Sequence, residues 1–332
     1  MKAVVVGSGA WGTALAIQLC KNGHDVTMWT FEKELIPQME QDRHNIRLPH
    51  IKLPAELKVS GDYACISGCK LVVMASPSFP ARIVARSAAP YIDNDAVVVS
   101  VTKGLEDKTF KRMSEVVAEE TGKEVVVLTG PSHAEEVALG VPTGCLAAHE
   151  NKALAEFVQD AFMSDCFRVY TSPDPVGAEL GAALKNVIAL CAGITDGLGC
   201  GDNTKAMLMT RGLTETARLG VSLGAKKETF TGLSGIGDLI VTCTSMHSRN
   251  RRAGILIGQG KDAKTAMEEV GAVVEGYYAA KAAYELGKRQ GIDMPITTAA
   301  YKVLYEGAEV KHTFGRLMIR GRKAESEDTG WM

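Results

Sequence analysis

The chain has 332 residues, which is too long for one domain of the usual size and suits two. Hydrophobic residues make up 46% and charged residues 23%, the balance of a globular protein with a large core. The formal net charge is −2, so the composition gives no general reason to expect nucleic acid or an anionic membrane as a partner. Any anion that this protein binds must therefore be held by a local site.

Eight cysteines are present, mostly in apolar stretches, and we expect them to be buried free thiols in a reducing compartment. Cys65 and Cys69 form a C-x3-C pair, but no neighbouring His or second Cys pair completes a zinc shell, so we expect no metal. No basic and apolar leader pattern precedes the first strand, and runs such as 187–194 fall far short of the ~20 residues that span a bilayer. We therefore expect a cytoplasmic protein without membrane insertion.

In the first half of the chain, short apolar runs alternate with helical patterns. Strands are expected at 3–6, 25–30, 71–75, 96–101, 125–128 and 144–148. Helices are expected after the first strand and around 79–89, 109–121 and 152–163, and residues 31–57 are expected to form a helix and a long loop arm. All-apolar strands that alternate with amphipathic helices indicate an α/β fold with a doubly wound parallel sheet covered on both faces.

The pattern changes near 171–175, where Pro173 and Pro175 end the alternation. Beyond this point the chain is expected to be all-α. The expected helices are 176–195, 203–224, 249–258, 263–270, 275–290 and 296–306. We therefore predict a first domain over 1–175 and a helical second domain over 176–332, with a polar tail at 324–332 that frays.

The first strand leads into Gly7-Ser8-Gly9-Ala10-Trp11-Gly12, which is a G-x-G-x-x-G loop. The first glycine makes the tight turn, the second lets the backbone approach a pyrophosphate, and the third lets helix and strand pack closely. The free N–H groups and the helix dipole then hold the phosphates. Because a strand precedes the loop and a helix and second strand follow it, we predict a Rossmann dinucleotide site here.

The choice between NAD and NADP stays open at this stage. Glu32 follows Gly12 by 20 residues, the spacing of an acid that binds the adenosine ribose. Lys33 and Arg43 are instead candidates for contact with a 2′-phosphate.

Four further stretches carry a family resemblance, together with the glycine loop and Val274-Glu275-Gly276. They are Val101-Thr102-Lys103-Gly104-Leu105-Glu106, Leu128-Thr129-Gly130-Pro131-Ser132, Ala182-Ala183-Leu184-Lys185-Asn186-Val187, and Gly237-Asp238-Leu239 with Ser248-Arg249-Asn250. In this order, and over nearly the whole chain, they resemble the bacterial-type NAD(P)-dependent glycerol-3-phosphate dehydrogenases. The resemblance implies an enzyme that interconverts sn-glycerol 3-phosphate and dihydroxyacetone phosphate with NAD or NADP, supplies glycerophospholipid synthesis and forms a homodimer.

The resemblance also implies the site residues, with Lys185 as the proton acceptor. The substrate would be bound by Lys103, Gly130, Ser132, Lys185, Asp238, Ser248, Arg249 and Asn250. The coenzyme would be bound by Gly7, Gly9, Ala10, Trp11, Gly12, Phe31, Lys103, Ala134, Arg249, Val273 and Glu275. Ala10 and Phe31 depart from the family, which often has a small hydroxyl residue and a polar ring at these positions.

The residues themselves favour the same chemistry. Hydride transfer from an alcohol needs a base for the hydroxyl proton and a cation near the developing oxyanion. Lys185 lies in an almost wholly apolar helix, where lost hydration lowers the pKa of a lysine; the alternative is an ammonium that snorkels to solvent. Lys103 follows a strand at the carboxyl edge of the sheet, or is a solvated loop lysine. Asp238 either orients Lys185, accepts from the substrate hydroxyl or caps a helix. His133 is interpreted as a bystander or as a wall of the coenzyme pocket.

Arg249 stands at a predicted helix start with Ser248 as its cap, so a guanidinium fork and helix N–H donors combine at one phosphate site. Arg251 and Arg252 are expected to be solvated, and Lys205 and Arg211 are expected to add positive potential at most. Two other functions compete with this one. A β-hydroxyacid dehydrogenase of the same plan would bind a carboxylate, whereas a coenzyme-sensing regulator would lack the base or the phosphate cation.

Overall fold

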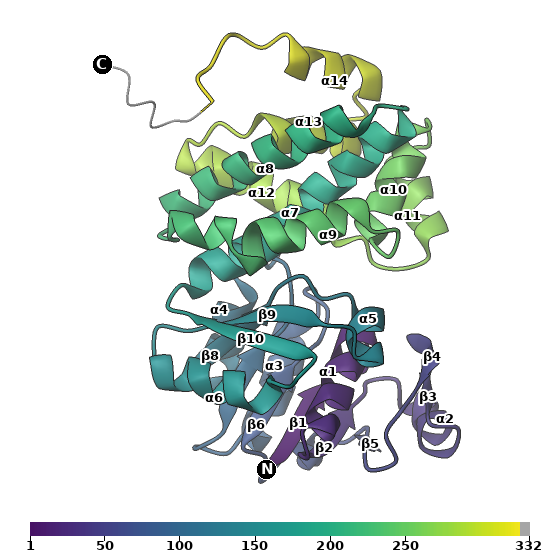
Figure 1. Ribbon diagram of the computed structural model, residues 1–332, viewed down its shortest axis with the longest axis vertical. Coiled ribbons are helices and arrows are strands. Elements are labelled where there is room, and N and C mark those ends of the chain that lie inside the picture. Colours follow the sequence, from purple (N-terminus) through teal and green to yellow (C-terminus); the bar gives the residue numbers. More distant parts are fainter. Residues whose placement is uncertain (326–332) are drawn as a thin grey trace.

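The computed structural model describes residues 1–325, so most of the predicted tail 324–332 lies outside the described residues. Eight strands form one sheet in the order β10-β9-β8-β7-β6-β1-β2-β5. Their bounds are β1 Lys2–Val6, β2 Asp25–Trp29, β5 Lys58–Ser60, β6 Leu71–Met74, β7 Val97–Ser100, β8 Val125–Thr129, β9 Thr143–Ala148 and β10 Phe167–Ser172. The sheet and its helices form the lower half of the molecule in Figure 1, and a helical part lies above them.

Apolar residues of the central strands face both sides of the sheet. Val5 of β1 packs into one cluster with Leu15 of helix α1, and Val4 packs into another cluster with Val84 of helix α3. The helices of this half are α1 Ala10–Lys21, α2 Ile36–Gln41, α3 Ala81–Ala88, α4 Met113–Thr121, α5 Ala134–Leu139 and α6 Lys152–Phe162. The α/β fold with a sheet covered on both faces is confirmed.

The sequence pattern predicts a parallel sheet, but one strand pair is antiparallel. β9 pairs with β8 antiparallel, whereas β10 pairs with β9 parallel. The segment 130–142 holds only the short helix α5, which packs on α1, and β9 starts beside the carboxyl end of β8. A parallel connection must return the chain to the amino end of the neighbouring strand. The short segment 130–142 instead leaves the chain at the carboxyl end of β8, so β9 runs in the opposite direction.

Four further strands were not predicted. Within the arm 31–57, β3 His44–Asn45 and β4 Leu48–Lys52 pair antiparallel. Directly after the arm, β5 adds an edge strand beside β2. β10 was missed as well, because its burial alternates and it carries no continuous apolar run.

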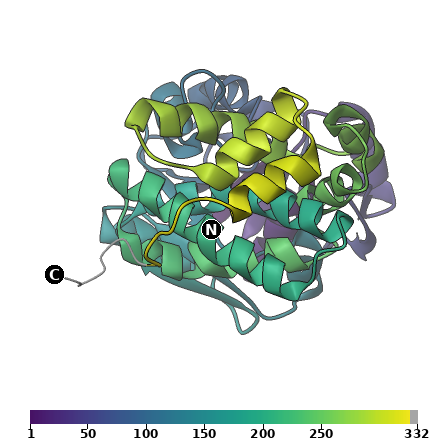
Figure 2. The same cartoon turned by 90° about the horizontal axis from the view of Figure 1, so that it is seen from above.

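The second half of the described chain is helical. Its helices are α7 Pro175–Gly197, α8 Asp202–Ser222, α9 Asp238–Thr244, α10 Arg249–Gly258, α11 Ala263–Val270, α12 Glu275–Gln290, α13 Pro295–Tyr305 and α14 Val310–Met318. The predicted bounds of α10, α11 and α12 agree with the structure, whereas no bounds were predicted for the short α5, α9 and α14. Seen from above, the last helices lie nearest the viewer, coloured yellow in Figure 2.

Helix α7 is the central element of this half. It contacts α8, α9, α10, α12 and α13, and its first turns also contact β8 and β9. It is the one helix within residues 1–325 that is long and apolar enough to cross a membrane, and 94% of its most apolar window is buried inside the molecule. It starts three residues after the end of β10, next to the predicted domain boundary.

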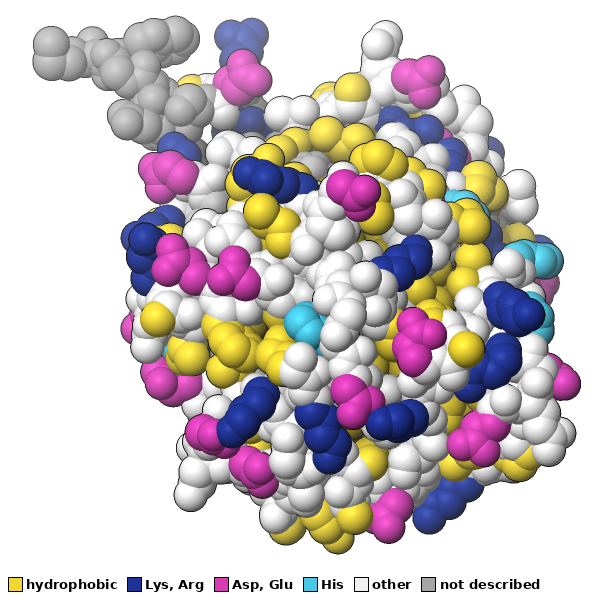
Figure 3. All heavy atoms as spheres, turned by 60° about the horizontal axis from the view of Figure 1, so that its bottom comes forward, with side chains coloured by type: hydrophobic (Ala, Val, Ile, Leu, Met, Phe, Trp, Pro, Cys, Tyr) yellow, Lys and Arg dark blue, Asp and Glu magenta, His cyan; other side chains and the backbone are white. Residues whose placement is uncertain are grey.

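All eight cysteines are free thiols. Burial raises the pKa of Cys191 and of Cys243 to about 12, so both thiols stay protonated at neutral pH. On the face shown in Figure 3, Lys and Arg side chains are interspersed with Asp and Glu, in keeping with the net charge of −2.

Candidate active site

The glycine loop joins β1 to α1 at the carboxyl edge of the sheet. Gly7 has φ +133°, and a Cβ there would lie 2.7 Å from the Ala75 carbonyl oxygen. A Cβ on Gly12 would lie 2.1 Å from the Gly7 carbonyl oxygen, whereas a Cβ on Gly9 would meet nothing within 4 Å. Gly7 and Gly12 are therefore required by packing, and Gly9 leaves the outer surface of the loop open for the approach of a ligand.

The end of β2 lies directly beside this loop. The Gly7 N–H donates to the Trp29 carbonyl at 3.0 Å, and the hydroxyls of Ser8 and Thr30 lie 2.7 Å apart. Phe31 is 83% exposed, so its ring is free to contact a ligand. Trp11 has a buried indole N–H without a partner among the described residues.

Arg43, one of the two candidates for contact with a 2′-phosphate, is partly engaged within the arm. Its guanidinium donates to the backbone carbonyls of Pro54 and of Leu57, the latter at 2.9 Å, and thereby closes the arm on itself. A guanidinium that already satisfies buried carbonyls would leave them unpaired if it turned to a ligand.

Two lysines meet one carboxylate where the helical half contacts the sheet. The Lys185 Nζ donates to Asp238 Oδ1 at 2.5 Å, and the Lys103 Nζ donates to Asp238 Oδ2 at 2.8 Å. Lys185 also donates to the Thr242 hydroxyl at 2.6 Å, and Lys103 donates to the Gly130 carbonyl at 3.1 Å. The Asp238 carboxylate, which is 1% exposed, therefore bridges both ammonium groups.

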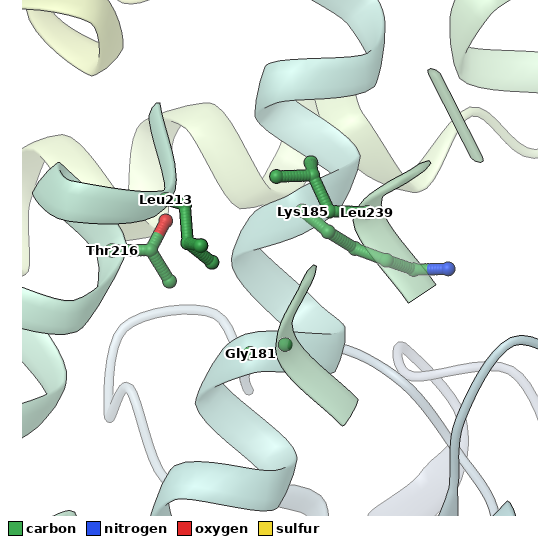
Figure 4. Close-up of a pocket in the computed structure, with 6 residues that line it drawn as sticks. Gly181, Lys185, Leu213, Thr216 and Leu239 are labelled. Atoms are coloured by element: carbon green, nitrogen blue, oxygen red, sulfur yellow. The ribbon is translucent and has the colours of Figure 1, made fainter. Parts of the chain in front are cut away.

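Burial acts strongly on Lys185. The residue is 7% exposed, and desolvation, partly offset by Asp238 and reinforced by Lys103, lowers the pKa of Lys185 from 10.5 to about 8. The Lys185 ammonium is therefore buried and does not snorkel to solvent. In Figure 4 the stem of Lys185 passes a small cavity, and its nitrogen points away from Leu213 and Thr216.

Local sequence explains how this cluster forms. A Cβ on Gly181, one turn before Lys185, would lie 2.6 Å from the Ser234 carbonyl oxygen, so the glycine lets the π-helical turn Leu233–Gly237 approach α7. α9 begins directly after this turn, at Asp238. Asp238 and Thr242 are four residues apart and share one helix face, so both reach Lys185.

Ser132 and His133 lie between the lysine cluster and α5. The Ser132 hydroxyl donates to the Gly130 carbonyl at 3.0 Å, next to the Lys103 ammonium, whereas Ala134 begins α5. The His133 ring lies tilted against the His247 ring, with centroids 5.6 Å apart, and its Nε2 is buried without a partner among the described residues. Burial and the nearby Lys185 charge lower the pKa of His133.

The start of α10 combines a cap, a cation and an amide. The Ser248 hydroxyl accepts from the Arg251 N–H at 3.2 Å, which confirms Ser248 as the helix cap. Arg249 is exposed, and its charge acts on the carboxylate of Glu275. Asn250 donates to the Asn186 amide oxygen at 2.9 Å and accepts from the Gly276 N–H at 2.8 Å. α7, α10 and α12 are thereby joined through one amide.

Glu275, at the start of α12, reaches back to the sheet. The Ser78 hydroxyl donates to its carboxylate at 3.0 Å, and burial raises the pKa of Glu275. Val273, two residues earlier, is partly exposed. Thr242 and Ser78 were missed by the sequence reasoning, although the i+4 spacing of Thr242 from Asp238 was a visible signal.

Three other basic residues have different surroundings from those expected. Arg251 is not solvated, because it is 14% exposed and bonds Asp196 at 2.8 Å. Lys205 pairs with the same carboxylate at 2.7 Å, at the end of α7 that lies away from Lys185. Arg211 donates to the Glu325 carbonyl at 3.0 Å. These cations support the packing of the helices.

A glycine loop on a Rossmann sheet, combined with a buried lysine supplied by a helical second half, defines the class of two-domain dinucleotide-binding α/β proteins. The family described as NAD-dependent glycerol-3-phosphate dehydrogenase N-terminus matches residues 2–155, and the corresponding C-terminus family matches residues 174–315. The chain therefore belongs to the NAD-dependent glycerol-3-phosphate dehydrogenase family.

Individual relatives agree over the full length. The chain is 49% identical over 326 residues to a glycerol-3-phosphate dehydrogenase [NAD(P)+] of Thermoanaerobacter sp. strain X514, covering 98% of this chain and 99% of the relative. It is 51% identical over 323 residues to one from Clostridium acetobutylicum, with 96% and 97% covered. The crystal structure of the glycerol-3-phosphate dehydrogenase from Coxiella burnetii is 37% identical, superposes with a TM-score of 0.92, and covers 96% of this chain and 99% of its own.

Proposed function

We propose that this protein is an oxidoreductase that interconverts sn-glycerol 3-phosphate and dihydroxyacetone phosphate with NAD or NADP, and supplies glycerol 3-phosphate for glycerophospholipid synthesis. The observation that carries the proposal is the buried Lys185, whose pKa is lowered to about 8, bound to Asp238 beside Lys103. A group that titrates near the working pH is suited to move a proton in both directions.

The coenzyme site fits the proposed ligand. The open surface at Gly9 and the N–H groups at the start of α1 suit a pyrophosphate, with Ala10, Trp11 and Gly12 in the first turn of that helix. Phe31 would contact the adenosine end, and Lys103, Ala134, Arg249, Val273 and Glu275 would border the rest of the coenzyme. When bound, NAD(P) accepts or returns the hydride.

In alcohol oxidation, the neutral Lys185 amine takes the proton of the substrate hydroxyl at Nζ. In ketone reduction, the Lys185 ammonium stabilises the forming alkoxide and returns that proton. Lys103 adds a second positive charge near the same oxygen. Asp238 holds both ammonium groups in place and acts as their common acceptor.

The phosphate of the substrate would bind at the start of α10. Its charge approaches two negative units at neutral pH, and the exposed Arg249 fork matches its oxygens. Asn250 is held in position by Asn186 and Gly276. Gly130, Ser132 and Ser248 would border the glycerol part, because they lie around Lys103 and the α10 start.

The test of the function is an absorbance assay at 340 nm (the nicotinamide band) with purified protein. NADH or NADPH should be consumed with dihydroxyacetone phosphate and far more slowly with unphosphorylated dihydroxyacetone, since phosphate binding energy lowers the barrier at the remote carbonyl. Equal rates with both ketones, or turnover of a β-hydroxyacid instead, would contradict the proposal.

We also propose that the protein is a cytoplasmic homodimer, by analogy with its family, and that its sequence divides into domains at residue 175. Sedimentation equilibrium should give twice the monomer mass of 35.4 kDa. A single species at the monomer mass over the micromolar range would contradict the dimer.

A further inference from the structure

The choice between NAD and NADP depends on which side chains contact the 2′ position of the adenosine ribose. The inference below rests on the proposed coenzyme site. In Rossmann sheets the acid that binds the ribose hydroxyls follows the second strand. Here β2 ends at Trp29, and Glu32 follows three residues later. The Thr30 hydroxyl accepts from the Glu32 N–H at 3.2 Å and contacts the Ser8 hydroxyl at 2.7 Å. Glu32 is thus tied to the glycine loop through two hydrogen bonds.

The arm brings a cation to the same place. Asn45, which is 2% exposed, donates to the Ser8 carbonyl at 2.9 Å and to the Thr13 hydroxyl at 2.8 Å. Its amide oxygen accepts from the Arg47 N–H at 2.9 Å. The Arg47 guanidinium then bonds Glu32 Oε1 at 2.7 Å. The backbones of the acid and of the cation are therefore both linked to Ser8, one through Thr30 and the other through Asn45.

Their exposure decides how this pair can respond to a ligand. The Arg47 side chain is 50% exposed and the Glu32 side chain 35% exposed, so the ion pair contributes little to stability and both groups are accessible to a ligand. A ribose hydroxyl can donate to the Glu32 carboxylate while Arg47 stays paired. A 2′-phosphate is repelled by Glu32, and its most suitable cation, Arg47, is already occupied. Arg43 is less suited than Arg47, because its Nη2 donates to the arm's own carbonyls.

We propose that Glu32 makes NAD(H) the preferred coenzyme of this protein, and that Arg47 is a phosphate-binding group which Glu32 holds inactive. Removal of the Glu32 charge then both ends the repulsion and releases the guanidinium. A single substitution should therefore convert an NAD-preferring site into one that accepts NADP.

The experiment measures the dissociation constants of NADH and NADPH by titration calorimetry, without substrate. We expect the unchanged protein to bind NADH at least about tenfold more tightly than NADPH, because like charges meet in the NADPH complex. Glu32→Gln should bind NADPH at least about tenfold more tightly than before. Arg47→Gln should keep NADH binding within about threefold, because an exposed pair contributes little, and bind NADPH no better. Glu32→Gln with Arg47→Gln should bind NADPH more weakly than Glu32→Gln alone, because only the part of the gain that comes from the lost repulsion remains.

Glu34→Gln is the matched control, since Glu34 is an exposed carboxylate in the neighbouring 3-10 helix Lys33–Leu35. It should leave the ratio of the two dissociation constants unchanged. NADPH binding as tight as that of NADH in the unchanged protein, or an unaltered ratio in Glu32→Gln, would overturn the inference. Selective NADH binding without turnover of dihydroxyacetone phosphate would instead contradict the proposed reaction and leave the inference standing. Binding of neither coenzyme would overturn both.

Discussion

At the scale of single residues, Lys185 is the group whose surroundings alter its chemistry most. Burial lowers its pKa to about 8, so the pH dependence of the proposed reaction follows from its titration. Alcohol oxidation needs the neutral amine, and its rate should rise with pH through about 8 and then level off. Ketone reduction needs the ammonium, and its rate should fall as pH rises through the same region.

Lys185→Met keeps much of the stem volume and removes the proton carrier. We expect kcat to fall at least ~100-fold, with coenzyme affinity nearly unchanged, because general acid–base contributions are of this order. The limb of the pH profile near 8 should disappear with it. A folded variant that retains more than about a tenth of the original kcat would show that another group is the base, since the typical loss is far larger.

A second prediction at this scale concerns the phosphate. Arg249→Lys keeps the charge and removes the two-point fork. The transition-state stabilisation given by kcat/KM for dihydroxyacetone phosphate should therefore fall by about 1.5–3 kcal/mol. Arg252→Lys is the matched control, because Arg252 is an exposed arginine of the same helix. Steady-state kinetics of both variants test this. Equal effects of the two substitutions would remove Arg249 from the phosphate site.

At the scale of elements, different glycines of the loop between β1 and α1 serve the packing of the fold and the binding of the coenzyme. Gly9→Val should leave the fold intact, because the backbone at φ −63° and ψ 170° is allowed for any residue and the Cβ meets no atom. It should weaken NADH binding at least about tenfold, since the side chain occupies the place of the pyrophosphate. Titration calorimetry and circular dichroism measure the two effects.

Gly12→Val provides the contrast to that variant. Its Cβ would lie 2.1 Å from the Gly7 carbonyl oxygen, so α1 cannot keep its place on β1. We expect a large loss of thermal stability. If Gly9→Val is the variant that unfolds while Gly12→Val stays folded, the assignment of packing and binding within the loop is wrong.

At the scale of the whole molecule, one buried carboxylate joins the two halves. Glu179 of α7 accepts from the Ser114 N–H at 2.8 Å and from Arg112 at 2.7 Å, at the start of α4. Glu179→Gln removes the charge, and the free energy of unfolding should fall by about 1.5–3 kcal/mol, the range for hydrogen bonds to charged groups. Glu156→Gln, in an exposed pair with Lys152, should cost less than about 1 kcal/mol. Similar losses in thermal denaturation of both variants would contradict this role of Glu179.

Much of this architecture was predictable because it depends on local patterns. The G-x-G-x-x-G spacing, the apolar strand runs and the caps act within a few residues, so they predicted the coenzyme loop and the bounds of α10, α11 and α12. The antiparallel β9 was not predictable, since periodicity reports the burial of a strand but not its direction. Short α5 and α9 hold too few residues to show a helical period.

The sequence alone therefore determined the Rossmann loop, the helical second half and the family motifs. Only the tertiary structure decided which charges meet. Lys185 and Asp238 are 53 residues apart, Lys103 and Asp238 are 135 apart, and they touch because Gly181 admits the π-helical turn against α7. Glu32 and Arg47 likewise meet directly, with Arg47 held at its N–H by Asn45, and Lys205 pairs with Asp196. Pairing between distant charges depends on backbone packing, which no local pattern in the chain records.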